Sequence, residues 1–138
     1  MRVPQSILER RVFIDTSAFL AIVDEEISKR CVSEKYGFLT TRFVVVETHA
    51  GLLGAVGTDE ARAFIESGLE EITEVPIEES DYQYAKRLIL EYRDKDYSLC
   101  DAISFAVVQR LSVSLAFAFD SHFRQHGFFT PLDQPQWP

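Results

Sequence analysis

The chain has 138 residues, 46% of them hydrophobic, and carries 22 acidic against 14 basic residues for a net charge of −8. This length and composition fit one globular domain and exclude a disordered chain. The acidic excess disfavours simple groove binding to nucleic acid, but it suits an enzyme in which metal ions bridge acidic side chains to phosphates.

The chain shows no sign of membrane targeting or of structural disulfides. No apolar run approaches the roughly 20 residues that a bilayer span needs, and residues 1–10 contain no signal-peptide core. Cys31 and Cys100 lie far apart and match no zinc or redox spacing. We therefore expect a cytoplasmic protein with reduced thiols and no membrane partner.

The first predicted strand ends in an acid. Val12–Ile14 is a short apolar run without polar alternation, which is typical of a strand buried on both faces. Asp15 follows, and Thr16 and Ser17 then cap a helix predicted from about Ser17 to Val23. Open α/β sheets bind ligands where buried strands end, although Asp15 would serve equally as a simple helix cap.

The rest of the chain alternates predicted strands and helices. Such alternation predicts an α/β fold with a parallel sheet covered by helices on both faces. The expected elements are, in order, Phe38–Thr41 (strand or turn), Arg42–Val56 (helix), Asp59–Leu69 (helix), Ile72–Ile77 (strand), Ser80 to about Arg93 (helix), Leu99–Leu111 (helix) and Leu115–Phe119 (strand).

Capping residues and a proline mark the ends of these elements. Thr58 and Ser98 are expected N-caps, and Ser80 with Gln83 has the spacing of a capping box. Pro76 indicates that its strand ends at the edge of the sheet.

Five acids occupy positions that would meet at one edge of the sheet. Asp15 and Asp120 directly follow apolar strands, Glu47 lies early in a helix, Asp101 lies in the first turn of another, and Asp96 lies in the loop before it. Two carboxylates ~4 Å apart repel by about 4 kcal/mol at an effective dielectric of 20. Such a cluster predicts bound cations or a basic partner group, and oxygen-only ligands favour Mg²⁺ or Mn²⁺.

Four segments of the chain resemble the PIN-domain family, in particular the VapC-type toxin ribonucleases. They follow the family's order and each falls in the expected kind of element. The segments are Val12–Phe19, Phe43–Leu53, Asp96–Phe105 and Ala118–Phe123.

The resemblance implies a three-layer α/β/α fold with a central, mostly parallel sheet of about four to five strands. It also implies metal-dependent hydrolysis of single-stranded RNA that leaves a 5′-phosphate and a 3′-hydroxyl. By the matching motifs, the catalytic, metal-binding acids would be Asp15, Glu47, Asp101 and Asp120, with Asp96 as an auxiliary metal ligand. Thr16 or Ser17 would support them by orienting a carboxylate or a water molecule.

The resemblance further implies the toxin of a type II toxin–antitoxin pair, whose partner is a small antitoxin that places a basic side chain among the acids. Relatives commonly form homodimers. The nuclease domain would cover residues 11–130, between an arm at 1–10 and a tail at 131–138.

Three departures from the family pattern stand out: the region Asp24–Gly37 is short, Ala118 replaces a common Thr or Ser, and the arm before Arg11 is extra. None of them removes an acid, so we expect an active enzyme. The alternatives are a housekeeping RNA-processing PIN nuclease and a metal-binding interaction module that has lost catalysis. A phospho-acceptor domain built on Asp15 is a weaker alternative, because its other required residues have no convincing positions.

Basic and aromatic side chains are candidates for RNA contacts, although each is more often an ordinary surface or core residue. Tyr92 and Tyr97 lie near the acidic loop, where they would stack on a base. The candidates for a basic rim are Arg87, Arg93, Lys95, Arg110 and Arg124.

Overall fold

Four parallel strands form the centre of the fold in the computed structural model, which describes residues 11–21, 37–70, 72–118 and 121–127. The strands are β1 (Arg11–Ile14), β2 (Gly37–Thr41), β3 (Ile72–Val75) and β4 (Leu115–Phe117). Their order is β3-β2-β1-β4, and all three neighbouring pairs are parallel. The sheet therefore gathers the carboxyl ends of its strands at one edge, as the alternation of elements predicted.

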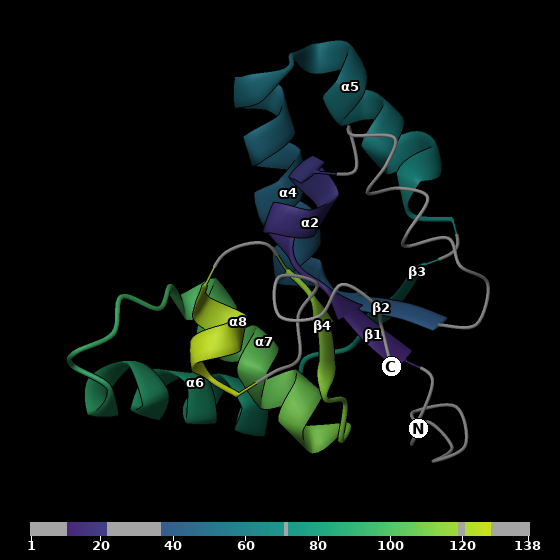
Figure 1. The fold of residues 1–138 in the computed structure, drawn as a ribbon. Helices are drawn as coiled ribbons and strands as arrows, with labels where there is room; N and C mark the ends of the chain where they lie inside the picture. The colour runs from purple at the N-terminus through teal and green to yellow at the C-terminus, as the bar shows by residue number, and fades with distance from the viewer. Residues whose placement is uncertain (1–10, 22–36, 71, 119–120, 128–138) are drawn as a thin grey trace.

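Helices cover both faces of this sheet. In Figure 1, α2, α4 and α5 lie on one side, whereas α6, α7 and α8 lie on the other. This arrangement confirms the predicted three-layer α/β/α fold. The helical elements are α2 (Thr16–Ala21), α4 (Arg42–Ala55), α5 (Thr58–Ala63), a π-helical turn η1 (Phe64–Gly68), α6 (Glu79–Glu91), α7 (Leu99–Arg110) and α8 (His122–Gln125).

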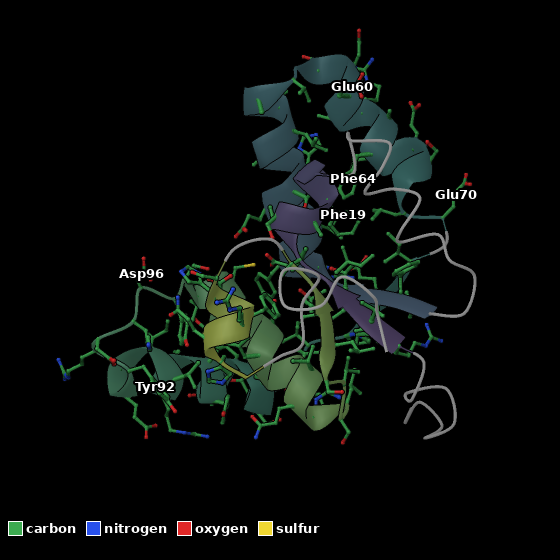
Figure 2. The ribbon with its side chains drawn as sticks, in the orientation of Figure 1. Phe19, Glu60, Phe64, Glu70, Tyr92 and Asp96 are labelled. Carbon is green, nitrogen blue, oxygen red and sulfur yellow. The ribbon has the colours of Figure 1, made fainter. Side chains whose placement is uncertain are left out.

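Aromatic side chains pack both layers onto the sheet. On one side Phe123 of α8 stacks on Phe13 of β1 with ring centroids 5.7 Å apart, and it meets Phe105 of α7 edge-on at 4.8 Å. On the other side Phe19 of α2 and Phe64 of η1 meet edge-on with ring centroids 5.2 Å apart, and Figure 2 labels both residues beside each other. These contacts fix α2 on one side of the sheet and α7 and α8 on the other.

The predicted capping box at the start of α6 is wrong. Its N-cap is Glu78, in an extended conformation (φ −93°, ψ 155°), and the Glu78 backbone N–H donates to Asp81 Oδ2 at 2.9 Å. Ser80 and Gln83 lie inside the helix instead. Asp81 is buried and bound by Arg110, so tertiary contact fixes the helix start two residues earlier than Ser80.

The helix predicted over Asp59–Leu69 also differs in detail. Thr58 is its first residue rather than its cap, because Gly57 adopts φ 103° and turns the chain there, in a conformation that glycine tolerates best. The helix then passes into η1 at Phe64. The strand β3 ends at Val75, just before Pro76, and lies at the sheet edge as predicted.

Several predictions fall on residues that the structure does not describe: the end of the first helix at Val23, most of the short region Asp24–Gly37, and the arm and tail. Among the described residues, no helix has the length and apolar character needed to cross a membrane.

Candidate active site

Asp15 lies at the carboxyl end of the central strand β1 and is only 1% exposed. Its Oδ2 accepts hydrogen bonds from the backbone N–H of Ser17 at 3.4 Å and from Ser17 Oγ at 3.1 Å. Thr40 of β2 donates its hydroxyl to the carbonyl of Ile14 at 2.9 Å, which ties the neighbouring strand to the residue before the acid. Ser17 therefore orients this carboxylate, as one of the two predicted supporting residues.

Thr16, the other predicted supporting residue, has a different contact. Its hydroxyl accepts a hydrogen bond from the buried Thr48 Oγ1 of α4 at 3.4 Å. This contact joins the start of α2 to the middle of α4, one residue after Glu47. The role of Thr16 toward a carboxylate or a water molecule stays a prediction.

Asp101 lies in the first turn of α7, where it takes part in a capping box. Its backbone N–H donates to Ser98 Oγ at 3.0 Å, and its Oδ2 accepts from the Ser98 backbone N–H at 3.2 Å. The residue is 5% exposed. The carboxylate of Asp101 therefore caps its own helix, and its part in a metal site stays a prediction.

Glu47 lies on α4, as predicted, and is exposed. The thiol of Cys100, one residue before Asp101, hydrogen bonds to Glu47. Burial raises the pKa of the Cys100 thiol far above its ordinary value, and the charge of Glu47, its hydrogen bond, and the charges of Asp15 and Asp101 raise it further. The charges of three of the four predicted catalytic acids therefore raise the pKa of one thiol, and Glu47 and Cys100 line the same cleft.

His122, which sequence reasoning left out, bridges two of the predicted acids. Its Nδ1 lies 2.7 Å from Asp101 Oδ2, and its Nε2 lies 3.1 Å from Asp96 Oδ1. Asp96 belongs to the loop between α6 and α7, and its contact with Nε2 turns its carboxylate toward the start of α8. The available signal was the position of His122 two residues after Asp120, at the start of a helix that follows a strand.

Two predicted RNA contacts do not hold. Tyr97 is 7% exposed and packs edge-on against Phe105, with ring centroids 5.1 Å apart, so its ring is not open to a base. Arg110 binds the carboxylate of Asp81 and the carbonyl of Pro76, which removes it from the predicted basic rim. Tyr92 remains 39% exposed.

The donor groups at this edge suit a hard divalent cation. Asp15, Glu47 and Asp101 offer carboxylate oxygens, the ligands that Mg²⁺ and Mn²⁺ favour. In the described part of the chain, no three or more Asp, Glu, His or Cys side chains stand in a ready-made metal-binding arrangement. Asp120, the fourth predicted acid, lies outside the described residues.

An apolar cleft of about 630 Å³ lies beside Glu47 and Cys100. It runs between the amino-terminal turns of α4, α6 and α7, and several of its apolar side chains are exposed, including Phe43 (46%), Val46 (63%) and Leu99 (41%). The other described lining residues are Glu47, Ile77, Glu78, Glu79, Tyr82, Cys100 and Ile103.

Comparisons with known proteins agree with the fold. The family profile of the PIN domain matches residues 12–128. Among solved structures, the Mycobacterium tuberculosis VapC20 toxin, described as cleaving the sarcin–ricin loop, is 25% identical over 86% of this chain and 96% of its own, with a TM-score of 0.77. No curated protein matches the sequence.

Two further solved structures share the fold at lower identity. VapBC2 of Rickettsia felis, bound to a promoter DNA fragment, is 8% identical over 87% of this chain and 96% of that chain, with a TM-score of 0.67. FitAcB of Neisseria gonorrhoeae is 13% identical over 86% of this chain and 95% of that chain, with a TM-score of 0.66.

Proposed function

The chain belongs to the PIN-domain family, and we propose that it is a metal-dependent endoribonuclease that acts as the toxin of a toxin–antitoxin pair. The observation that carries the proposal is that Asp15 directly follows the inner strand β1, Asp101 lies in the first turn of α7, and Glu47 lines one cleft with Cys100, the residue before Asp101. A cluster of carboxylates of this kind is electrostatically unfavourable without a cation. It therefore favours an enzyme that binds Mg²⁺ or Mn²⁺ over a protein whose acidic side chains only form a surface for a binding partner.

Each residue then has a part in hydrolysis of an RNA phosphodiester. Asp15, Glu47 and Asp101 would hold the cation, together with Asp120 by its place in the last motif. Ser17 holds the buried carboxylate of Asp15, and Ser98 holds that of Asp101. A divalent cation bound there supplies Lewis acidity toward the scissile phosphate and lowers the pKa of the attacking water.

A cleavage assay tests the proposal. A labelled single-stranded RNA and an RNA oligonucleotide carrying the sarcin–ricin loop, chosen because VapC20 cleaves that loop, are incubated with Mn²⁺, with Mg²⁺ and with EDTA. We expect cleavage that needs the metal and is lost in Asp101→Asn. The matched control is Asp59→Asn, which changes an exposed acid in the first turn of α5 and should cleave like wild type. Metal-dependent cleavage that persists in Asp101→Asn would overturn the assignment.

The toxin role separates this proposal from a housekeeping nuclease and from an inactive interaction module. A toxin arrests growth when expressed alone and is neutralised by a small protein encoded next to it. The structural similarity to VapBC2 and FitAcB supports such a partner. Growth unaffected by an enzyme that cleaves RNA in vitro would favour the housekeeping alternative.

We further propose a homodimer and a nuclease domain covering residues 11–130. The exposed apolar side chains of Phe43, Val46 and Leu99 support self-association, because such a surface is stabilised when a second copy covers it. Sedimentation of the full chain tests this, and a Val46→Asp variant should shift a dimer toward the monomer.

A further inference from the structure

The imidazole of His122 lies between two carboxylates that come from different elements. Its Nδ1 is 2.7 Å from Asp101 Oδ2 in the first turn of α7, and its Nε2 is 3.1 Å from Asp96 Oδ1 in the preceding loop. His122 itself begins α8, at the far end of the chain. One ring therefore connects three segments at the edge of the candidate active site.

The ring is held in place by aromatic packing. Tyr97 meets it edge-on with centroids 5.5 Å apart at 78°. The next residue, Phe123, is fully buried between Phe13 and Phe105 and anchors the short helix α8 to the sheet. Packing thus presents the two ring nitrogens to the acids.

The two contacts differ in their surroundings. The Asp101 side chain is 8% exposed and the imidazole 22%, whereas the Asp96 side chain is 90% exposed. A contact to a well-solvated carboxylate contributes little, because water screens the charge and the side chain loses entropy. The contact between His122 and Asp101 is therefore the stronger of the two.

The hydrogen bond to Asp101 adds to the capping box at the same oxygen. Oδ2 of Asp101 accepts from the backbone N–H of Ser98 at 3.2 Å and lies 2.7 Å from His122 Nδ1. Two partners at one carboxylate oxygen fix the rotation of the carboxylate about its Cβ–Cγ bond. Residues that orient the ligands of a metal in this way affect its affinity strongly.

We propose that His122 is a positioning residue that sets the orientation of the Asp101 carboxylate toward the active-site cation and draws Asp96 to the edge of the site. The inference rests on the proposed function, because it assigns a role at the metal-binding acids. It adds a residue, outside the acids themselves, on which metal affinity depends.

Three substitutions separate the two contacts. In His122→Asn the amide nitrogen lies close to the position of Nδ1 and keeps the bond to Asp101. In His122→Gln the longer amide reaches toward the position of Nε2 and Asp96. His122→Ala removes both contacts.

The readout is the dissociation constant for Mn²⁺, measured by titration calorimetry on the full chain. We expect His122→Ala to weaken binding by about 10- to 100-fold. His122→Asn should recover most of the affinity, and His122→Gln should recover little. His49→Gln, which changes a half-buried histidine on α4, is the matched control and should bind like wild type.

Each outcome bears on a different statement. A wild-type protein that neither binds Mn²⁺ nor cleaves RNA overturns the proposed function. A wild-type protein that does both, while His122→Ala binds Mn²⁺ equally well, overturns the positioning role alone. If His122→Gln binds Mn²⁺ as wild type does and His122→Asn does not, the contact with Asp101 is not the one that matters. If His122→Ala fails to fold, the comparison of His122→Asn with His122→Gln still decides between the two contacts.

Discussion

Arg110 on α7 binds the carboxylate of Asp81 on α6 through two nitrogens: Nε donates to Oδ1 at 3.0 Å, and Nη2 donates to Oδ2 at 2.9 Å. The Asp81 side chain is only 3% exposed, whereas that of Arg110 is 28% exposed. The same guanidinium donates to the carbonyl of Pro76 at 3.1 Å, so one side chain connects the end of β3 to both helices. The hydrogen bond to Asp81 raises the pKa of Arg110 further, which keeps the guanidinium charged.

Removing the guanidinium should destabilise the fold. Arg110→Ala would leave a buried carboxylate without its counter-charge, and we expect the free energy of unfolding to fall by about 3 kcal/mol, allowing for the partial exposure of Arg110. Urea denaturation measures this. Arg87→Ala, at an exposed position on α6, should change stability by less than about 0.5 kcal/mol. Equal stability of the two variants would contradict the role given to the pair.

The stability of the protein should also fall as the pH falls below neutrality, partly because of His126. Burial lowers the pKa of His126 below its ordinary 6.5, and its ring stacks on Phe105 with centroids 4.5 Å apart. Below about pH 6.5 the unfolded chain binds a proton that the folded chain resists, so the free energy of unfolding decreases as the pH falls. His126→Phe keeps the aromatic stacking and removes this proton, so its melting temperature should fall less between pH 7.5 and 5.5. Identical slopes for the variant and wild type would refute the prediction.

The thiol of Cys100 should react slowly with alkylating reagents, because the thiolate is the reactive form and burial and Glu47 both raise the pKa of this thiol. In a Cys31→Ser background, we expect iodoacetamide at pH 8 to modify the folded protein at least about tenfold more slowly than the urea-unfolded chain. Glu47→Gln should speed the reaction of the folded protein, because it removes a negative charge beside the sulfur. An unchanged alkylation rate in Glu47→Gln would show that the charge of Glu47 does not act on the Cys100 thiol.

The fold could be predicted from the sequence wherever local pattern and tertiary packing agree. Val12–Ile14 is apolar at every position because β1 is the inner strand between β2 and β4, and this burial on both faces is what the pattern predicted. Ser98 was likewise predicted as an N-cap, because its hydrogen bond to the Asp101 backbone is local.

Prediction was wrong where a distant residue decides the local structure. Ser80 and Gln83 have the spacing of a capping box, but Asp81 is bound by Arg110, 29 residues away, and α6 starts at Glu79. His122 was missed for the same reason, because its contacts to Asp96 and Asp101 span 26 and 21 residues and leave no local pattern. The acids were recognisable individually by their positions, whereas the groups that orient them depend on how α7 and α8 pack.

The acids of the candidate site should lower the stability of the metal-free protein. Asp15 is buried, and the charges of Asp15, Glu47 and Asp101 all raise the pKa of the Cys100 thiol, so we expect these like charges to repel one another when no cation is bound. We expect Asp15→Asn, whose amide oxygen still accepts from Ser17, to melt in EDTA at a temperature equal to or above that of wild type. Addition of Mn²⁺ should raise the melting temperature of wild type, since a ligand that binds only the folded state stabilises it, and should raise that of Asp15→Asn much less. Asp59→Asn is the matched control, and it should respond to Mn²⁺ as wild type does. An Asp15→Asn protein that is less stable in EDTA and gains as much from Mn²⁺ as wild type would show that Asp15 is a structural cap and not a metal ligand.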